Sequence, residues 1–330
     1  MNSNGARVTD FDKILVTGAT GFIGHAFVGF LLSKGGHSVR VALRREGLSW
    51  PDTVERAYIE DLASANDWSK AVNGVRVVVH TAARVHVMQE NSSSPLNEFR
   101  RVNVQGTLSL ARQAAAAGVR RFVFVSSIKV NGEATRLGSP FTADDMPAPL
   151  DAYGISKLEA EQGLRQIAAE TGMEVVVVRP PLVYGPGVRA NFQTLLRAVA
   201  RGLPLPLGAI DNRRSLVALD NLVDLIVTCI SHPHAANQTF LVSDGEDVST
   251  PELIRRMARA MGRPARLIPV PVWLLKVGAA LPGKQDMAQR LCGSLLVDIE
   301  KTRRLLGWTP PISLDEGLRR VAGGVAVNKH

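Results

Sequence analysis

The fold that this sequence predicts is α/β: a doubly wound parallel sheet with helices on both faces, followed by a smaller second domain. Three observations predict it. Short apolar runs recur along the first half of the chain, helical stretches separate them, and a glycine-rich turn follows the first run. Alternation of strands and helices is typical of parallel sheets that are covered on both faces. A length of 330 residues leaves room for two domains.

The expected strands are rich in Val, Ile and Phe and lack polar alternation, as in strands buried on both faces. They lie at residues 13–16, 38–43, 75–80, 121–126 and 174–179. Helical spacing of apolar residues occurs at 25–33, 96–117 and 151–170. After Pro180 the pattern changes to loops rich in Pro and Gly. We therefore expect a first domain over residues 1–182, to which 215–243 returns, and a second domain over 183–214 and 244–330.

Composition excludes several classes of protein. Hydrophobic residues make up 45% and charged residues 21%, which is typical of globular chains. The net charge of +9 comes from dispersed Lys and Arg that do not interleave with aromatic residues, so no nucleic-acid partner is expected. Two cysteines without a CxxC or Cys/His cluster predict no metal site and a reducing, cytoplasmic location. The apolar stretch at 270–281 is too short to span a bilayer, which leaves a buried helix or a surface resting on a membrane.

The first chemical motif is TGATGFIG at residues 17–24, between the first strand and the first helix. Glycines allow a tight turn and let backbone N–H groups approach a pyrophosphate, while the helix N-terminus adds partial positive charge. The motif predicts a Rossmann-type dinucleotide-binding domain. Its candidate contacts are Gly18, Thr20, Gly21, Phe22, Ile23 and Gly24.

The second strand indicates which dinucleotide binds. An acidic residue at its end would accept from the ribose 2′-hydroxyl of NAD, whereas arginine favours the 2′-phosphate of NADP. Here the strand ends in Arg44 and Arg45. We therefore expect NADPH as the cofactor, with NAD as the alternative.

A Tyr–Lys pair supplies the predicted chemistry. Tyr153 and Lys157 are four residues apart on a predicted helix and so share a face. A nearby ammonium and a cationic cofactor ring would lower the pKa of the phenol towards neutrality. Ser126 and Ser127 end a predicted strand, and a serine hydroxyl there can hydrogen-bond the substrate oxygen.

With these motifs the chain resembles the extended short-chain dehydrogenases/reductases, the NAD-dependent epimerase/dehydratase family that acts on nucleotide sugars. The resemblance implies that Ser127, rather than Ser126, is the catalytic serine and that Lys157 also holds the nicotinamide ribose. Asn131 stands where the family usually has tyrosine, which implies an altered pocket wall. Further cofactor contacts implied by the resemblance are Asp61 (to the adenine), Leu62, Thr81, Ala82, Ala83, Asn103 and Pro180.

The resemblance also implies where a nucleotide sugar binds. Arg214 and Arg290 match two arginines that meet the substrate diphosphate, and paired arginines suit a diphosphate because their bonds are bidentate and charge-assisted. The remaining implied substrate contacts are Asn191 and Leu205 for the base, His86 and Lys129 for the sugar, and the small pair Gly293 and Ser294 beside an N-acetyl group.

Around His86 and Lys129 the chain is similar to bacterial enzymes of surface-polysaccharide (O-antigen) synthesis. This similarity implies a homodimeric, NADPH-dependent 4-reductase of a UDP-4-keto-6-deoxy-N-acetylhexosamine. The alternative is a UDP-N-acetylhexosamine 4-epimerase. A dehydratase is disfavoured because no acidic residue follows Ser127 directly. An intact set of Ser127, Tyr153 and Lys157 argues against a non-enzymatic regulator, and the two arginines argue against a reductase of small hydrophobic ketones.

Overall fold

A seven-stranded parallel sheet forms the centre of the computed structural model, which describes residues 12–45, 50–63, 66–85, 94–278 and 291–327. The strand order is β3-β2-β1-β4-β5-β6-β9, and every neighbouring pair is parallel. The predicted fold class is confirmed. The strands are β1 (Lys13–Thr17), β2 (Ser38–Leu43), β3 (Val54–Tyr58), β4 (Val77–His80), β5 (Arg121–Val125), β6 (Glu174–Arg179) and β9 (Thr239–Leu241).

The two edge strands, β3 and β9, are absent from the strands that the sequence pattern predicts. β3 reads VERAY and alternates more and less buried residues, while β9 has three residues. The pattern sought, a continuous apolar run, belongs to inner strands that are covered on both faces. It therefore finds β1, β2, β4, β5 and β6 and misses the edges.

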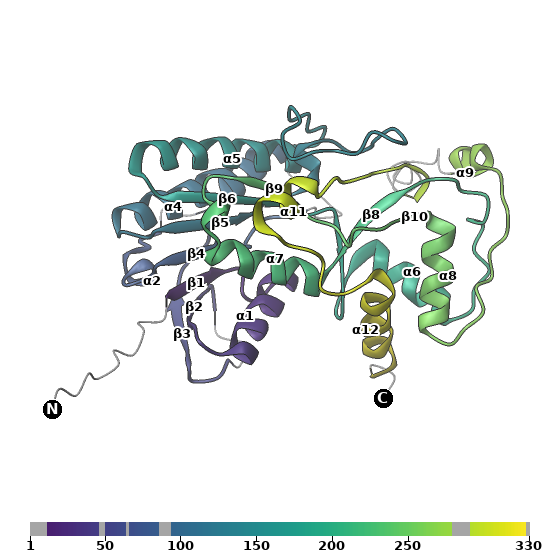
Figure 1. The fold of residues 1–330 in the computed structure, drawn as a ribbon, viewed down its shortest axis with the longest axis horizontal. Coiled ribbons are helices and arrows are strands. Elements are labelled where there is room, and N and C mark those ends of the chain that lie inside the picture. Colours follow the sequence, from purple (N-terminus) through teal and green to yellow (C-terminus); the bar gives the residue numbers. More distant parts are fainter. Residues whose placement is uncertain (1–11, 46–49, 64–65, 86–93, 279–290, 328–330) are drawn as a thin grey trace.

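Helices cover both faces of the sheet (Figure 1). The side chains of Ile14 and Val16 in β1 enter one apolar core, and that of Leu15 between them enters the other. This alternation is what a strand with two buried faces requires. The first core includes α1 (Phe22–Lys34) and α7 (Leu219–Ser231), and the second includes α2 (Ser69–Val72), α4 (Thr107–Ala116) and α5 (Ala152–Thr171).

The helical stretch expected at 96–117 is divided into three parts. It runs as α3 (Pro95–Phe99), a π-helical segment (Arg100–Gly106) and α4. A Cβ on Gly106 would lie 2.1 Å from the carbonyl oxygen of Leu62, so the segment passes directly against the loop after β3. The apolar spacing over 96–117 does not reveal this interruption.

A smaller sheet and its helices lie beside the large sheet (Figure 1). In the order β10-β8-β7, the strands are β10 (Asp247–Val248), β8 (Arg214–Ala218) and β7 (Leu182–Tyr184). The accompanying helices are α6 (Ala190–Ala200), α8 (Thr250–Ala260), α9 (Val272–Gly278) and α12 (Leu314–Val327), whereas α11 (Glu300–Leu306) packs on the core of the large sheet beside β9. The helix α9 forms the described part of the apolar stretch at 270–281, and its Trp273 and Val277 are exposed. Among the described helices, none is long and apolar enough to cross a membrane.

Candidate active site

The glycine motif forms a tight turn between β1 and α1. Gly18 has a φ of +74°, and a Cβ there would lie 2.6 Å from the backbone nitrogen of Ala82. A Cβ on Gly24 would lie 2.3 Å from the carbonyl oxygen of Gly18. These two glycines therefore let the turn pack against the loop after β4.

Gly21 leaves the N-terminus of α1 open. It is the N-cap residue, no side chain caps the helix, and the first turn contains no acidic residue. Thr20 and Gly21 are exposed, while Phe22 and Ile23 are half-buried and pack on the core. An uncapped helix N-terminus behind an exposed glycine fits a phosphate group, since its N–H groups and dipole favour an anion.

The other predicted cofactor contacts meet at the same edge of the sheet, because they follow neighbouring parallel strands. Arg44 and Arg45 are exposed directly after β2. The remaining residues at this edge are Asp61 and Leu62 after β3 and Thr81, Ala82 and Ala83 after β4. The hydroxyl of Thr81 donates to the carbonyl of Thr17 at 2.8 Å, which joins the loop after β4 to β1.

Asn103 and Pro180, two further predicted cofactor contacts, also hold backbone segments together. The buried amide of Asn103 donates to Ser156 Oγ at 3.0 Å and to the carbonyl of Arg84 at 3.1 Å, and its oxygen accepts from the Arg84 N–H. The carbonyl of Pro180, also buried, accepts from the N–H of Ile128 at 2.9 Å. Both residues therefore fix backbone segments beside the candidate catalytic group.

Ser127 and Lys157 both lie at the end of β5. Ser127 follows this strand and starts a short 3₁₀ turn, where its Oγ accepts from the N–H of Lys129 at 3.2 Å. Lys157 extends from α5 and donates from Nζ to the carbonyl of Val125 at 2.9 Å, two residues before Ser127. Its ammonium also lies 4.3 Å from the ring centroid of Phe124, a favourable cation–π contact.

Tyr153 is held one turn before Lys157 on α5. The carboxylate of Asp151 caps this helix by accepting from the N–H of Gly154 at 2.7 Å. A Cβ on Gly154 would lie 2.9 Å from the carbonyl oxygen of Lys129, so the start of α5 passes against the turn that Ser127 begins. The helix cap and this close approach fix Tyr153 beside that turn.

Burial is the main cause of the pKa shifts of Tyr153 and Lys157. It raises the pKa of the Tyr153 phenol, and the negative charge of Asp151 raises it further. Burial lowers the pKa of Lys157 to about 7, although Glu161 opposes this shift. The expected lowering of the tyrosine pKa is therefore not a property of the chain alone. Within the protein, Tyr153 is a neutral phenol and can donate a proton.

Lys157→Met is expected to flatten the pH dependence of stability between about pH 7 and pH 10.5. In this window the unfolded lysine holds a proton that the folded one has released, so the stability of the wild type rises with pH. The variant lacks this contribution. Denaturant unfolding of both proteins across this range, without added nucleotide, measures the effect. Parallel stability curves would contradict the shifted pKa.

A buried ion pair lies behind the catalytic group. Arg179, at the end of β6, donates to both carboxylate oxygens of Glu161 at 2.9 and 2.6 Å, and both side chains are buried. Ser126 also donates to Glu161, at 2.6 Å, so Ser126 serves this pair while Ser127 faces the pocket. Asn131 is buried and accepts from Arg179 at 2.9 Å, so this residue stabilises the ion pair, and the altered pocket wall that its departure from tyrosine implies stays a prediction. This ion pair was not predicted from the sequence, although Glu161 lies four residues after Lys157 and therefore on the same face of the predicted helix.

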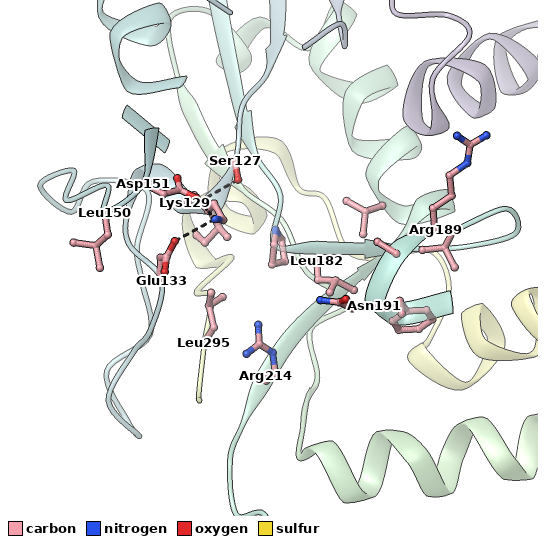
Figure 2. A pocket seen from close by; sticks show the side chains of 16 residues that line it. Ser127, Lys129, Glu133, Leu150, Asp151, Leu182, Arg189, Asn191, Arg214 and Leu295 are labelled. Carbon is pink, nitrogen blue, oxygen red and sulfur yellow. Dashed lines mark hydrogen bonds and ion pairs between the residues drawn. The ribbon is translucent and has the colours of Figure 1, made fainter. Parts of the chain in front are cut away.

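A pocket of about 610 Å³ opens beside Ser127 (Figure 2). Four predicted substrate residues line it, namely Ser127, Lys129, Asn191 and Arg214. Further lining residues, which sequence reasoning missed, include Glu133, Asp151, Arg189 and Leu295. The missed residues come together only through the tertiary fold, since they lie on separate loops and elements.

The other substrate predictions have different outcomes. Leu205 is not among the residues that line the pocket; it pairs with Leu267 and packs on the core of the smaller sheet. Gly293 and Ser294 do not line it either, and the carbonyl of Gly293 accepts from Arg214 at 3.1 Å. The contacts expected of Leu205 with the base and of Gly293 and Ser294 with an N-acetyl group stay predictions. His86 and Arg290 lie outside the described residues.

Comparison with known proteins identifies the family. Residues 14–243 match the NAD dependent epimerase/dehydratase family. The chain belongs to this family. The match includes Ser127, Tyr153, Lys157 and Arg214, and it ends before Leu295, which also lines the pocket.

Individual members and solved structures are similar along nearly the whole chain. A UDP-glucose 4-epimerase of Vibrio cholerae is 49% identical, with 94% of each chain covered. A 2-alkyl-3-oxoalkanoate reductase of Stenotrophomonas maltophilia is 29% identical, covering 95% of this chain and 99% of its own. MoeE5, solved in complex with UDP-glucose and NAD, is 27% identical with a TM-score of 0.75, covering 96% of this chain and all of MoeE5. It has also been solved in complex with UDP-glucuronic acid and NAD.

Proposed function

We propose that the chain is a UDP-hexose 4-epimerase that keeps a nicotinamide cofactor bound through the reaction. The observation that carries this proposal is the pocket itself, which joins Ser127 at one side to Arg214 and Asn191 across from it. This arrangement suits a sugar beside the catalytic group and a diphosphate beside an arginine. The similarity to a UDP-glucose 4-epimerase over 94% of the chain supports the same reaction.

The residues that would hold the cofactor fit it. The open N-terminus of α1 would hold the pyrophosphate, and Lys157, which donates to the carbonyl of Val125 two residues before Ser127, would bind the nicotinamide ribose. When bound, the nicotinamide supplies hydride acceptance from C4 of the sugar and hydride return to it.

The chain's own residues move the proton. Tyr153 exchanges it with the oxygen on C4, and Ser127 Oγ hydrogen-bonds that same oxygen. Lys157, on the same face of α5, provides a positive charge that favours the phenolate form of Tyr153, which accepts the proton from the sugar hydroxyl and so becomes the phenol that later gives it back. Inversion at C4 further requires the sugar to present its opposite face before the hydride returns. A pocket of about 610 Å³ provides room for this rotation.

The proposal is tested by incubating the purified protein with UDP-glucose, UDP-galactose and their N-acetyl counterparts. We expect interconversion of each pair at C4 without net formation of reduced cofactor. Failure to interconvert any pair, with cofactor bound, would refute the epimerase assignment.

A 4-reductase that uses NADPH is the second candidate, and Arg44 and Arg45 favour it. Both are exposed at the end of β2, where a guanidinium can meet a 2′-phosphate. Supplying NADPH with UDP-4-keto-6-deoxy-N-acetylglucosamine, and identifying the product sugar by NMR, tests this candidate. Stoichiometric oxidation of NADPH would favour the reductase over the epimerase.

Arg44→Asp combined with Arg45→Ala is expected to weaken NADPH binding while NADH binding is kept or improved. A carboxylate repels a 2′-phosphate but accepts from a 2′-hydroxyl, and the loss of one charge-assisted bond corresponds to roughly 10- to 150-fold in affinity. Titration of both cofactors into both proteins measures the change. If the ratio of NADPH affinity to NADH affinity did not change, Arg44 and Arg45 would not determine cofactor selectivity. The support for the reductase would then be lost.

Arg214→Ala is expected to raise KM for the nucleotide sugar more than it lowers kcat. Its guanidinium lies in the pocket, where the Gly293 carbonyl orients it, and a diphosphate contact is made equally in the ground and transition states. Loss of such a bond should cost roughly 10- to 150-fold in affinity. Arg213→Ala, the neighbouring arginine that does not line the pocket, is the matched control. If NADPH or NAD binding fell instead, Arg214 would serve the cofactor.

A further inference from the structure

The pocket has two ends of opposite charge. Figure 2 shows Ser127, Lys129, Glu133 and Asp151 gathered on one side, with Arg189 and Asn191 across from them and Arg214 between. On the proposed function, the arginine end takes the diphosphate. The sugar then lies at the other end, beside Ser127.

The sugar end contains two carboxylates for one ammonium. Lys129 Nζ donates to Glu133 Oε1 at 3.1 Å and also to a carboxylate oxygen of Asp151. The three side chains are 24%, 29% and 22% exposed, so solvent screens them only in part. Among the described lining residues, this end therefore carries a net negative charge. The ammonium of Lys129 is already engaged and is a poor receptor for another anion.

The carboxylates of Asp151 and Glu133 differ in their other contacts. Asp151 also caps α5 and sets the charge near Tyr153, so its replacement would disturb the helix and the chemistry together. Glu133 lies outside any helix or strand and bonds the ammonium of Lys129. It can therefore be changed with less effect on the position of Tyr153.

We propose that Glu133 determines which sugars the pocket accepts according to their charge. It favours the neutral UDP-hexoses and UDP-N-acetylhexosamines and disfavours the anionic UDP-uronates. A carboxylate on the sugar would meet like charge in a partly desolvated pocket, which disfavours binding. Neutral sugars instead bring hydroxyl and amide N–H donors, for which carboxylate oxygens are strong acceptors. This inference rests on the proposed function and narrows its substrate class. Similarity to MoeE5 leaves the point open, because that protein has been solved with a UDP-uronate and with a neutral UDP-hexose.

The test measures Kd for UDP-glucose, UDP-glucuronate and UDP by calorimetry, with kcat/KM as a second readout. We expect the wild type to bind UDP-glucose at least about tenfold more tightly than UDP-glucuronate, a difference of about 1.4 kcal/mol. Glu133→Gln keeps the shape of the side chain and removes its charge, so it should narrow this ratio to about threefold or less. Lys129→Met should widen the ratio, because it leaves both carboxylates without the ammonium.

Glu170→Gln is the matched control, since it removes one negative charge from an exposed position on α5 away from the pocket. Its Kd ratio should equal that of the wild type. Equal affinity of the wild type for the two nucleotide sugars, or an unchanged ratio in Glu133→Gln, would overturn the inference. Binding without any conversion at C4 would refute the proposed epimerase while leaving the charge selection measurable, so the two failures are distinguishable.

Discussion

Tyr153→Phe is expected to lower kcat by about 10²- to 10⁴-fold, the usual contribution of a positioned proton donor and acceptor. The substitution removes the phenolic oxygen and leaves the ring, which packs edge-on against Phe99 with centroids 6.0 Å apart. Cofactor affinity and the unfolding midpoint should stay close to those of the wild type. Steady-state kinetics and cofactor titration on the same preparation measure both quantities.

Tyr58→Phe is the matched control for this variant. Tyr58 ends the edge strand β3 and is 55% exposed, so loss of its hydroxyl should leave kcat within about twofold, in line with the small effects of most surface changes. If Tyr153→Phe turned over within about threefold of the wild type, Tyr153 would not be the group that exchanges the proton with the substrate oxygen.

Arg179→Met is expected to destabilise the fold by about 3–5 kcal/mol, because it leaves the buried carboxylate of Glu161 without its main cation. A buried, uncompensated charge costs more than the pair contributes. The double variant Arg179→Met with Glu161→Leu should recover most of the lost stability, since apolar groups of similar size can replace a buried pair. Denaturant unfolding of the two variants and the wild type gives the free energies.

A second arginine on the same carboxylate supplies the control. Arg165 contacts Glu161 at 3.0 Å but is 47% exposed, so Arg165→Met should cost about 1 kcal/mol or less. Equal losses in Arg179→Met and Arg165→Met would show that burial does not distinguish the two contacts. The account of the network behind Ser127 would then be wrong.

The inner strands and the glycine turn could be predicted because their signals are local. An apolar run identifies a strand such as β4, and closely spaced glycines identify the turn before α1. Edge strand β3 was not predicted because its alternate residues are exposed and it lacks a continuous apolar run. The π-helical segment was not predicted because its close contact, that of Gly106 with Leu62, joins residues far apart in the sequence. Both are properties of the assembled fold rather than of the segment.

The candidate site divides in the same way. Tyr153 and Lys157 follow from spacing on one helix, whereas the bond between Lys129 and Asp151 joins residues 22 positions apart. The contact of Asn131 with Arg179 likewise joins residues that are 48 positions apart. Leu205 packs against the core beside the smaller sheet, and its strand-like bridge to Leu267 joins residues 62 positions apart. Sequence spacing shows which residue types are present, and only the fold shows which side chain reaches the pocket.

Sequence motifs cannot separate the epimerase from the reductase, because both reactions use the same serine, tyrosine and lysine. The difference lies in the fate of the hydride, which an epimerase returns to C4 and a reductase takes from an external cofactor.

The fate of a deuterium at C4 therefore tests the central claim most directly. UDP-glucose carrying deuterium at C4 is incubated with the protein, and the products are analysed by NMR and mass spectrometry. We expect UDP-galactose that retains the deuterium at C4, with no label passing to added cofactor or to water. Transfer of the label into the added cofactor, or its loss to solvent, would contradict the proposal that this chain returns the hydride to the carbon from which it came.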